Sequence, residues 1–290
     1  MGSLRYKHTL LFFLIPPLAF YFVFFGIPFL RTVYISLFNW NGLSAPEFLG
    51  LKNYLDLFKD HLFSVGFGRI TIWAILSVLI KVGLALILAN LLRTKIRGSG
   101  FFTSVYFIPV VISASAISLM FILIYDLDIG ALNVFLRMIG LESLTHSWLG
   151  DSTTAFYAVI AVPLFHGIGY FFVILLAGIQ GVPESLYEAA KVDGASALQL
   201  FFRVTIPSIW PVIQICVILA ITGALKSFDY IYVMTKGGPG NATQVPATYL
   251  YEVTFVGGKF GYGSALAIMI FLFGVVATIL FKKFSSVISE

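Results

Sequence analysis

Residues 188–207 read EAAKVDGASALQLFFRVTIP and place charges and small residues between two long apolar segments. Glu188 and Lys191 supply charges of both signs, and Ala189 and Ala190 allow another backbone to approach closely. This pattern favours docking of a partner protein over bond-making chemistry, because small residues permit close packing while charges fix the orientation. A hairpin that only connects two membrane spans is the alternative that these residues leave open.

The residue patterns of other chemistries are missing from the sequence. ATP hydrolysis needs a GxxxxGK[ST] loop around the phosphates, but the pair Gly258-Lys259 is followed by Phe260 and has no upstream glycine at that spacing. Cys216 is the single cysteine, and His166 has no acidic or thiol partner at metal-ligand spacing. An intramembrane enzyme would need paired carboxylates or a nucleophile with its base. We therefore expect no catalytic residue, no metal site and no cofactor bound by this chain.

The elements that hold these residues are membrane helices. The 290 residues are 59% hydrophobic and 11% charged, with a mean hydropathy of +0.98, whereas soluble domains carry about 25% charged residues. A bilayer core needs about 20 apolar residues per helix. Six stretches approach or exceed that length, roughly at residues 10–29, 70–92, 105–125, 156–179, 209–228 and 265–281. We therefore expect an all-α membrane protein with six transmembrane helices, the first being too long for a signal-peptide core.

The distribution of lysine and arginine orients these helices. With six spans both termini share one side with the segments near 93–104 and 180–208. That side carries nine cationic residues in short segments: Arg5, Lys7, Arg93, Lys95, Arg97, Lys191, Arg203, Lys282 and Lys283. The other side carries seven in longer loops: Arg31, Lys52, Lys59, Arg69, Arg137, Lys236 and Lys259. Because cations are enriched in cytoplasmic segments, we expect both termini in the cytoplasm, and the net charge of +5 indicates topology rather than nucleic-acid binding.

Local signals predict the structure of the loop at residues 180–208. Pro183 suits the first position of a helix that runs to about Val192 and ends at Gly194. Residues 195–204 then form a second predicted helix, which stops before Pro207 because proline disfavours a helical residue before it. We expect Pro207 to open the fifth span.

The outer side carries its own ordered segments. We expect residues 1–69 to form the first helix and an outer segment, and residues 70–290 to form a five-helix core that includes the 180–208 loop. Apolar residues at helical spacing predict a short amphipathic helix that lies at the interface or caps the bundle: Leu51, Tyr54, Leu55 and Phe58. The loop at 126–154 is expected to be an ordered cover, and the Gly-Gly-Pro-Gly run at 237–240 predicts a turn.

Four segments together resemble the permease subunits of binding-protein-dependent ATP-binding cassette (ABC) importers. EAAKVDGASALQLFFRVTIP is similar to their EAA motif, with Glu-Ala-Ala, a glycine six residues after the Glu, and a closing proline. FLGLKNYLDLF, SFDYIYVMTKGGPGNAT and FGYGSALAIMIFLF resemble the carbohydrate branch, in particular the first permease of the maltose or glycerol-phosphate type. The chain has no large extracytoplasmic insertion of the kind found in some maltose-type members, so it resembles the minimal six-helix form.

The resemblance implies a type I importer permease (MetI-like) fold in a bacterial or archaeal inner membrane. It implies a second, similar permease, two cytoplasmic ATPase subunits that use ATP and Mg²⁺, an extracytoplasmic solute-binding protein and a sugar substrate, without nucleic acid. It also implies a coupling helix that docks on the ATPase, and the residues carried over are Glu188, Ala189, Ala190, Asp193, Gly194 and Pro207.

Polar groups inside two spans are candidates for the solute pathway, because polar residues in a membrane are costly and indicate a function. They are His166, Gly167 and Tyr170 in the fourth span and Thr222, Gly223 and Ser227 in the fifth. Sugars bind through aromatic faces and hydrogen-bonding side chains, and the resemblance implies the same two helices. Hydrogen bonding between helices is the alternative for each residue.

Three charged residues inside or near the spans leave two interpretations open. Lys81 is either a site for a charged solute or a lysine held by neighbouring helices, and Lys226 and Asp229 either pair or line the pathway. An ion-coupled carrier would place carboxylates inside the membrane and usually contain an internal repeat, whereas the acids of this chain lie almost entirely in loops. That carrier class is the functional alternative to the ABC permease.

Overall fold

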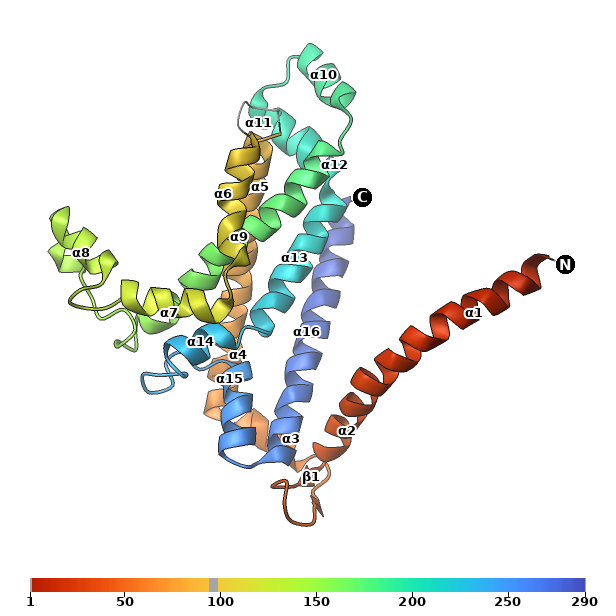
Figure 1. Cartoon of the computed structure of the whole chain (residues 1–290), viewed down its shortest axis with the longest axis vertical. Helices are drawn as coiled ribbons and strands as arrows, with labels where there is room; N and C mark the ends of the chain where they lie inside the picture. The colour runs from red at the N-terminus through yellow and green to blue at the C-terminus, as the bar shows by residue number, and fades with distance from the viewer. Residues whose placement is uncertain (1, 94–98, 290) are drawn as a thin grey trace. The chain divides into compact units, whose positions relative to one another are not determined.

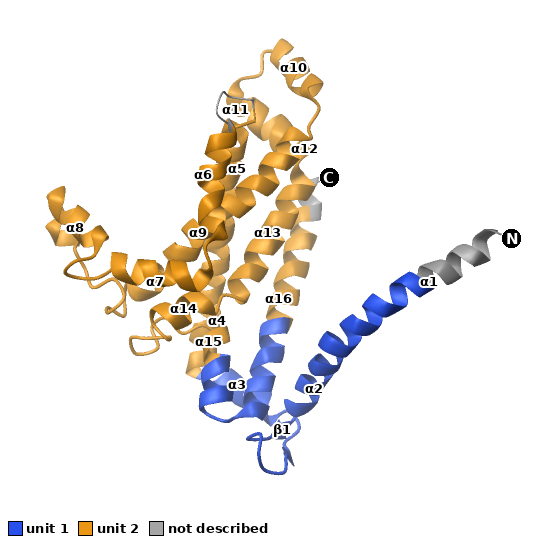
Figure 2. Cartoon of the chain, viewed as in Figure 1, with its two compact units in different colours: residues 1–60, 250–271 blue, residues 61–249, 272–290 orange. Residues whose placement is uncertain are grey.

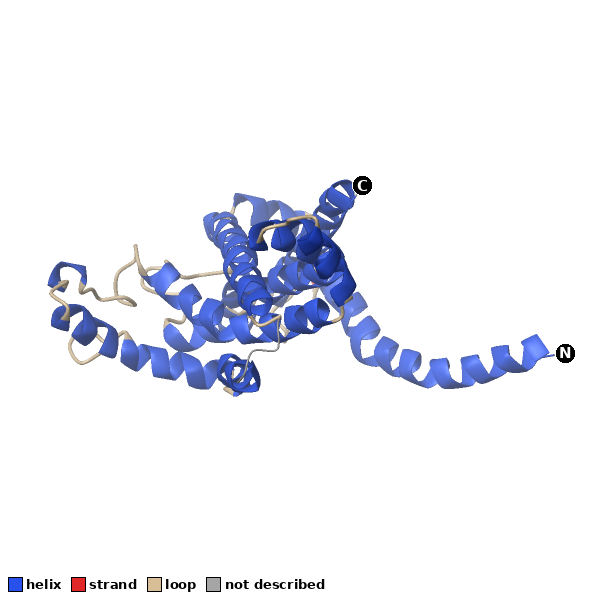
Figure 3. Ribbon diagram, turned by 90° about the horizontal axis from the view of Figure 1, so that it is seen from above, coloured by secondary structure: helices blue, strands red, loops and turns tan. Residues whose placement is uncertain are grey.

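The computed structural model describes residues 2–93 and 99–289, and most of these residues are helical (Figures 1 and 3). The predicted cytoplasmic cations Lys95 and Arg97 fall outside the described residues, as do the side chains of Arg5 and Lys7. Two compact units make up the chain: residues 1–60 with 250–271, and residues 61–249 with 272–290 (Figure 2).

The first unit begins with one long apolar helix followed by a hairpin. The helix consists of α1 (Gly2–Tyr21), the π-helical turn η1 (Phe22–Gly26) and α2 (Ile27–Ile35). None of the apolar window in Phe12–Ile35 is buried within the chain, so this span must be covered by lipid or another protein. Strands β1 (Phe38–Asn39) and β2 (Glu47–Phe48) pair antiparallel and are followed by α3 (Lys52–Lys59).

The predicted amphipathic helix is confirmed as α3, but its apolar face is not the packed face. Leu51, Leu55 and Phe58 are exposed, whereas Asn53 and Leu57 are buried. The Asn53 amide donates hydrogen bonds to the carbonyl oxygens of Ser36 (2.8 Å) and Phe38 (3.0 Å) at the end of α2 and in β1. A polar anchor therefore fixes α3, and Leu51 and Leu55 of its apolar face are exposed.

The start of α16 (Phe260–Ser289) also belongs to the first unit, and its small residues allow close packing. A Cβ built on Gly261 would overlap the carbonyl oxygen of Phe38, and the Gly261 N–H donates to the carbonyl oxygen of Trp40 (3.2 Å). The neighbouring Tyr262 hydroxyl donates to the Asp60 carboxylate at 2.6 Å. The FGYG segment thus joins α16 to the hairpin and to the end of α3.

The second unit contains the remaining membrane helices. Its N-terminal half has α4 (His61–Leu76), the π-helical turn η2 (Ser77–Val82), α5 (Gly83–Leu91), α6 (Ser99–Val111), α7 (Ala114–Ile124), α8 (Ala131–Met138) and the 3-10 turn η3 (Glu142–Leu144). Its C-terminal half has α9 (Ala155–Gln180), α10 (Glu184–Val192), α11 (Ala197–Leu200), the π-helical turn η4 (Phe201–Thr205), α12 (Ile206–Ser208), α13 (Trp210–Leu225), α14 (Asp229–Met234) and most of α15 (Pro246–Tyr251), which leads to the π-helical turn η5 (Glu252–Val256).

Five helices in the described residues are long and apolar enough to cross a membrane, or six when a bent pair counts as one span. The bent pair is the correction to the predicted third span: α6 and α7 meet at an angle of 93° instead of forming one helix. The cause is local. Pro109 lies in the last turn of α6, and Ser113 adopts an extended conformation and caps α7 by accepting the Ala116 N–H (3.2 Å).

Helix α9 is the centre of the second unit. Its N-terminal half packs in one apolar cluster with α4, α7 and α14, and its C-terminal half packs in another with α5 and α13. A Cβ built on Gly169 would overlap the carbonyl oxygen of Tyr106, so α6 approaches the α9 backbone at a point that only glycine permits.

The predicted ordered cover at 126–154 is built around Asn133, which is fully buried. Its amide donates to the carbonyl oxygens of Asp126, Leu127 and His146, and its oxygen accepts from the His146 N–H and the Trp148 indole. The Asp126 carboxylate accepts the N–H groups of Ile129 and Asp128, which lowers the pKa of that carboxyl. One buried amide therefore organises the whole loop.

Candidate functional site

The EAA-type segment forms a short capped helix, α10, at one end of the second unit (Figure 1). The predicted end near Val192 is confirmed. Gly194 has φ of +80°, its N–H donates to the Lys191 carbonyl oxygen (3.0 Å), and the Ala195 N–H donates to the Ala190 carbonyl oxygen (2.9 Å). These two bonds define a Schellman C-cap, which needs a left-handed residue at the glycine position. Pro183 precedes the helix as its N-cap instead of opening it.

The second predicted helix of this loop differs from the structure. Ser196 and Gln199 form a reciprocal capping box that starts α11, as their side chains and backbone N–H groups bond each other at 2.8 and 3.3 Å. The helix does not stop before Pro207, because η4 carries it into α12, where Pro207 occupies the first turn. The break falls instead at Ile209, and the fifth span begins at Trp210.

The residues expected to dock on a partner lie at the outward surface of α10 and at its C-terminal end. Glu188, Ala189, Asp193 and Gly194 are exposed and Ala190 is half-buried. Val192 is 88% exposed, so an apolar side chain adds to this surface. Small, charged and apolar groups on a capped helix form a rigid surface that is suited to a protein partner.

The inward side of α10 holds residues that the sequence analysis passed over. Tyr187 is 1% exposed, and its ring lies against the guanidinium of Arg93, with 3.7 Å between Cζ and the ring centroid. The Tyr187 hydroxyl lies 3.2 Å from the Thr205 hydroxyl, which donates to Asn90 Oδ1 at 3.4 Å. A single aromatic residue in this helix, with a cation at the end of the second span, was the available signal.

His166 forms hydrogen bonds at the break between α6 and α7. Its Nε2 lies 3.1 Å from the Ile112 carbonyl oxygen and its Nδ1 lies 2.6 Å from the Tyr230 hydroxyl. A carbonyl oxygen can only accept, so the partners assign the proton to Nε2 and make Tyr230 the donor to Nδ1. Ile112 is the first residue after α6, and His166 therefore links its carbonyl to α14. Both ring nitrogens are used for interhelical bonds.

The neighbouring residues of α9 lie in different surroundings. Gly167 faces Lys81, whose Cδ and Cε would lie 3.1 Å from a Cβ built on the glycine. Lys81 is 8% exposed in the π-helical turn η2, and no ion pair to it is present in the described residues. Tyr170 is 44% exposed, so its ring is accessible.

The pathway candidates of the fifth span make local bonds. The Thr222 hydroxyl donates to the Ile218 carbonyl oxygen and the Ser227 hydroxyl to the Gly223 carbonyl oxygen, each at 2.8 Å. A Cβ on Gly223 would meet no atom within 4 Å, so the space beside this glycine is open. The structure joins His166 to Tyr230 but brings no hydroxyl of α13 to it.

Lys226 and Asp229, for which the sequence left pairing open as one interpretation, do not lie on one helix. Lys226 is the C-cap of α13, and Asp229 is the first residue of α14 after a break. No ion pair joins them among the ion pairs that the described residues form. A break places the two side chains outside the regular i, i+3 geometry that would have brought them together.

The Gly-Gly-Pro-Gly turn leads into a buried polar segment. Thr243 and Gln244 are buried, and a Cβ built on Gly237, which has φ of +89°, would overlap Gln244 Oε1. The Arg69 guanidinium donates to the carbonyl oxygens of Asn241 and Gln244. The predicted turn is confirmed, and its glycine makes room for a side chain of the same loop.

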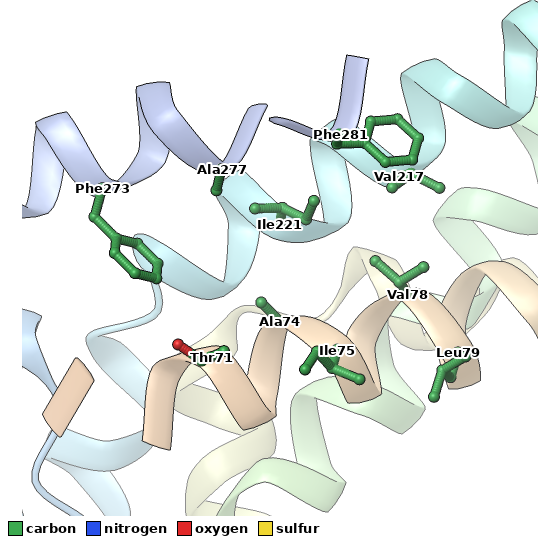
Figure 4. Close-up of a pocket in the computed structure, with 10 residues that line it drawn as sticks. All are labelled: Thr71, Ala74, Ile75, Val78, Leu79, Val217, Ile221, Phe273, Ala277 and Phe281. Atoms are coloured by element: carbon green, nitrogen blue, oxygen red, sulfur yellow. The ribbon is translucent and has the colours of Figure 1, made fainter. Parts of the chain in front are cut away.

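An apolar cavity of about 300 Å³ lies between α4 with η2, α13 and α16 (Figure 4). Its lining residues are Thr71, Ala74, Ile75, Val78, Leu79, Val217, Ile221, Phe273, Ala277 and Phe281. The one hydroxyl, that of Thr71, donates to its own helix at the Phe67 carbonyl oxygen (2.7 Å). This cavity therefore offers no polar group to a sugar and suits only apolar chains.

Comparison with known proteins agrees with this architecture. The family model described as "Binding-protein-dependent transport system inner membrane component" matches residues 81–289. The chain is 39% identical over 275 residues to the probable ABC transporter permease protein YurN of Bacillus subtilis, covering 94% of each chain. It is 33% identical over 277 residues to the multiple sugar-binding transport system permease protein MsmF of Streptococcus mutans, again covering 94% of each. It is 32% identical over 286 residues to the trehalose/maltose transport system permease protein MalF of Thermococcus litoralis, covering 97% of this chain and 96% of that one.

The fold has a close counterpart among solved structures. A chain of a bacterial alginate ABC transporter, solved in complex with an alginate pentasaccharide-bound periplasmic protein, matches with a TM-score of 0.84 over 99% of this chain and 97% of that chain. The sequences are 20% identical, so the likeness concerns the fold, and it confirms the predicted type I importer permease fold. Because the family model covers most of the chain and the relatives match nearly end to end, this chain belongs to the binding-protein-dependent transport system inner membrane component family.

Proposed function

We propose that this chain is one permease subunit of an ATP-driven, binding-protein-dependent importer of sugars and forms half of its translocation pathway. The observation that carries the proposal is the exposed surface of α10, because it presents the EAA-type residues on a helix whose C-terminal end is capped. The names of MsmF and MalF, which refer to multiple sugars and to trehalose and maltose, support sugars as the substrate class.

The partners follow from what the sequence lacks. Without a phosphate-binding loop, the chain needs separate ATPase subunits to hydrolyse ATP with Mg²⁺. A second permease would complete the pathway, and a solute-binding protein outside the membrane would deliver the sugar. In this arrangement Glu188, Ala189 and Gly194 dock on an ATPase subunit, and closure of the ATPase pair moves α10 as a rigid body. The movement rotates the membrane helices and switches the solute pathway between its inward- and outward-facing states.

The solute pathway is proposed along α9, α13 and the residues just after α13, at the six candidate positions already named. Tyr170 and Gly223 have accessible surface or open space beside them, whereas the side chains of His166, Thr222 and Ser227 form hydrogen bonds within the protein. Tyr170 is therefore the first candidate for stacking on a sugar ring.

Reconstitution in liposomes tests the proposal. With the second permease, the ATPase and the binding protein present, sugar uptake should require ATP, and this chain alone should move no sugar. Ala189→Arg on α10 should weaken ATPase binding by about 30-fold, the effect of losing about 2 kcal/mol at a contact in the centre of an interface. Ala131→Arg, at an exposed alanine of α8, is the matched control and should leave binding unchanged. Uptake driven by an ion gradient without ATPase would refute the proposal and support an ion-coupled carrier.

A further inference from the structure

The inner side of α10 is tied to the membrane helices by a set of side chains that we call the α10 anchor: Asn90, Arg93, Glu184, Tyr187 and Thr205. They lie in three elements of the second unit, α5, α10 and η4, except for Arg93, which follows the C-cap of α5. Tyr187 is the only fully buried residue of α10. A helix otherwise on the surface thus places one aromatic ring in the interior.

A chain of hydrogen bonds runs from Tyr187 into the bundle. The Thr205 hydroxyl donates its proton to Asn90 Oδ1, so its oxygen is left to accept the Tyr187 O–H. Thr205 is 1% exposed, and a buried hydroxyl without partners would be costly. The bonds therefore connect α10 to η4 and to α5 at once.

Arg93 supplies the second connection. Its guanidinium stacks on the Tyr187 ring, and its Nη1 lies 3.8 Å from a Glu184 carboxylate oxygen on the first turn of α10. The Arg93 side chain is 14% exposed, and within the described part of the chain its Nη1 makes no hydrogen bond. A planar guanidinium can stack flat on the ring and face a carboxylate at once, whereas the ammonium of lysine is a compact charge without a planar face.

These contacts matter because the covalent links of α10 are short and allow rotation. Only residues 181–183 separate it from α9, and the left-handed Gly194 follows it. We propose that Tyr187 and Arg93 are positioning residues that hold α10 rigidly to α5 and η4, so that a displacement of α10 reaches the membrane helices. The inference rests on the proposed function and adds the residues that transmit the movement.

The test separates docking from transmission in the reconstituted complex. Tyr187→Ala removes the ring and the hydroxyl, Tyr187→Phe removes only the hydrogen bond, and Arg93→Lys keeps the charge but loses the planar stack. Binding of the ATPase should stay close to that of the unmodified chain, because none of these side chains belongs to the outward surface. The number of sugars imported per ATP hydrolysed should fall about tenfold for Tyr187→Ala, within the range of typical coupling free energies, and less for Tyr187→Phe. Tyr157→Phe, at an exposed tyrosine of α9, is the control and should have no effect.

A distance measurement provides the readout that a loss of folding would not mimic. Spin labels on Lys191→Cys in α10 and Leu91→Cys in α5 occupy exposed positions, while the native Cys216 is buried. The distance distribution should be narrow in the unmodified background and broaden with Tyr187→Ala. If Tyr187→Ala fails to reach the membrane, Tyr187→Phe and Arg93→Lys provide the same comparison. Unchanged coupling with a narrow distribution would overturn the inference, whereas ATP-independent uptake by the unmodified complex would instead refute the proposed function.

Discussion

The left-handed conformation of Gly194 offers the sharpest test of the α10 structure. The glycine has φ of +80°, and a Cβ built on it would meet no atom within 4 Å. In the chain by itself, the effect of Gly194→Ala is therefore backbone strain alone, without a steric clash. Gly194→Asn is the matched variant, because asparagine enters the left-handed region more readily than alanine.

The expected magnitude follows from the left-handed conformation. An alanine in that region costs about 1–2 kcal/mol, which lowers the ratio of capped to uncapped α10 by about 5- to 30-fold. The two cap bonds, from the Gly194 and Ala195 N–H groups, break together in the uncapped state. Gly194→Asn should retain most of the cap, and Gly194→Asp should also retain it while adding a negative charge beside Asp193.

Hydrogen exchange and ATP-driven uptake together form the assay. In the peptide that covers residues 184–196, amide exchange should accelerate with Gly194→Ala and much less with Gly194→Asn. If uptake depends on the helix cap, Gly194→Asn transports sugar and Gly194→Ala is impaired. If the partner instead requires that position 194 carry no side chain, both variants fail. Exchange by Gly194→Ala at the rate of the unmodified chain would refute the conformational reasoning. Full uptake by Gly194→Asp would refute the assignment of this loop to coupling.

Two further predictions concern packing. Gly169→Ala should lower the stability in detergent by about 1–3 kcal/mol, because its Cβ would overlap the Tyr106 carbonyl oxygen. Gly83→Ala is the control, because its Cβ would meet no atom and should not destabilise the protein. Equal melting temperatures of the two variants would contradict the close approach of α6 to Gly169. Asn133→Ala should open the 126–154 loop to proteolysis by leaving buried groups without partners, at a cost of about 2 kcal/mol or more, while Arg137→Ala in the same loop should be milder. Equal cleavage rates of these two variants would remove Asn133 from its organising role.

The elements that were predictable are those fixed by local signals. The end of α10 follows from a glycine after a helix-forming run, and α3 follows from the spacing of Leu51, Leu55 and Phe58. The face on which α3 packs was not predictable, because in a membrane protein the apolar face can point away from the protein core. Asn53 is buried because it bonds the carbonyl oxygens of Ser36, at the end of α2, and Phe38, in β1, which no periodicity reveals.

The break in the third span shows the same limit. Its composition is apolar throughout, so hydropathy predicts one helix from 105 to 125, and the structure bends it at residues 112–113. Pro109 and Ser113 are the sequence signals of the break, but only the tertiary partner, His166, satisfies the freed carbonyl. Buried polar residues and helix irregularities therefore coincide at three places: His166 bonds the carbonyl freed at the bend, Lys81 lies in η2, and Thr205 lies in η4.

This coupling of polar groups to irregular backbone narrows the candidates for sugar contact. His166 has both ring nitrogens in interhelical bonds, whereas Tyr170 is 44% exposed, and the described structure gives its hydroxyl no hydrogen bond. Tyr170→Ala should raise the sugar concentration for half-maximal uptake by about 5-fold or more, since stacking contacts of an aromatic ring are worth about 1–3 kcal/mol. Tyr170→Phe should retain most of the affinity, because it keeps the ring.

His166→Phe should behave differently from the Tyr170 variants. It leaves the Ile112 carbonyl oxygen and the Tyr230 hydroxyl without their partner, so we expect lower thermal stability and less protein in the membrane. The sugar concentration for half-maximal uptake should stay unchanged in the protein that remains. A change in that concentration for His166→Phe, with none for Tyr170→Ala, would contradict the assignment of the sugar contact to Tyr170. It would mean that the sugar binds the imidazole in place of the Ile112 carbonyl oxygen or the Tyr230 hydroxyl.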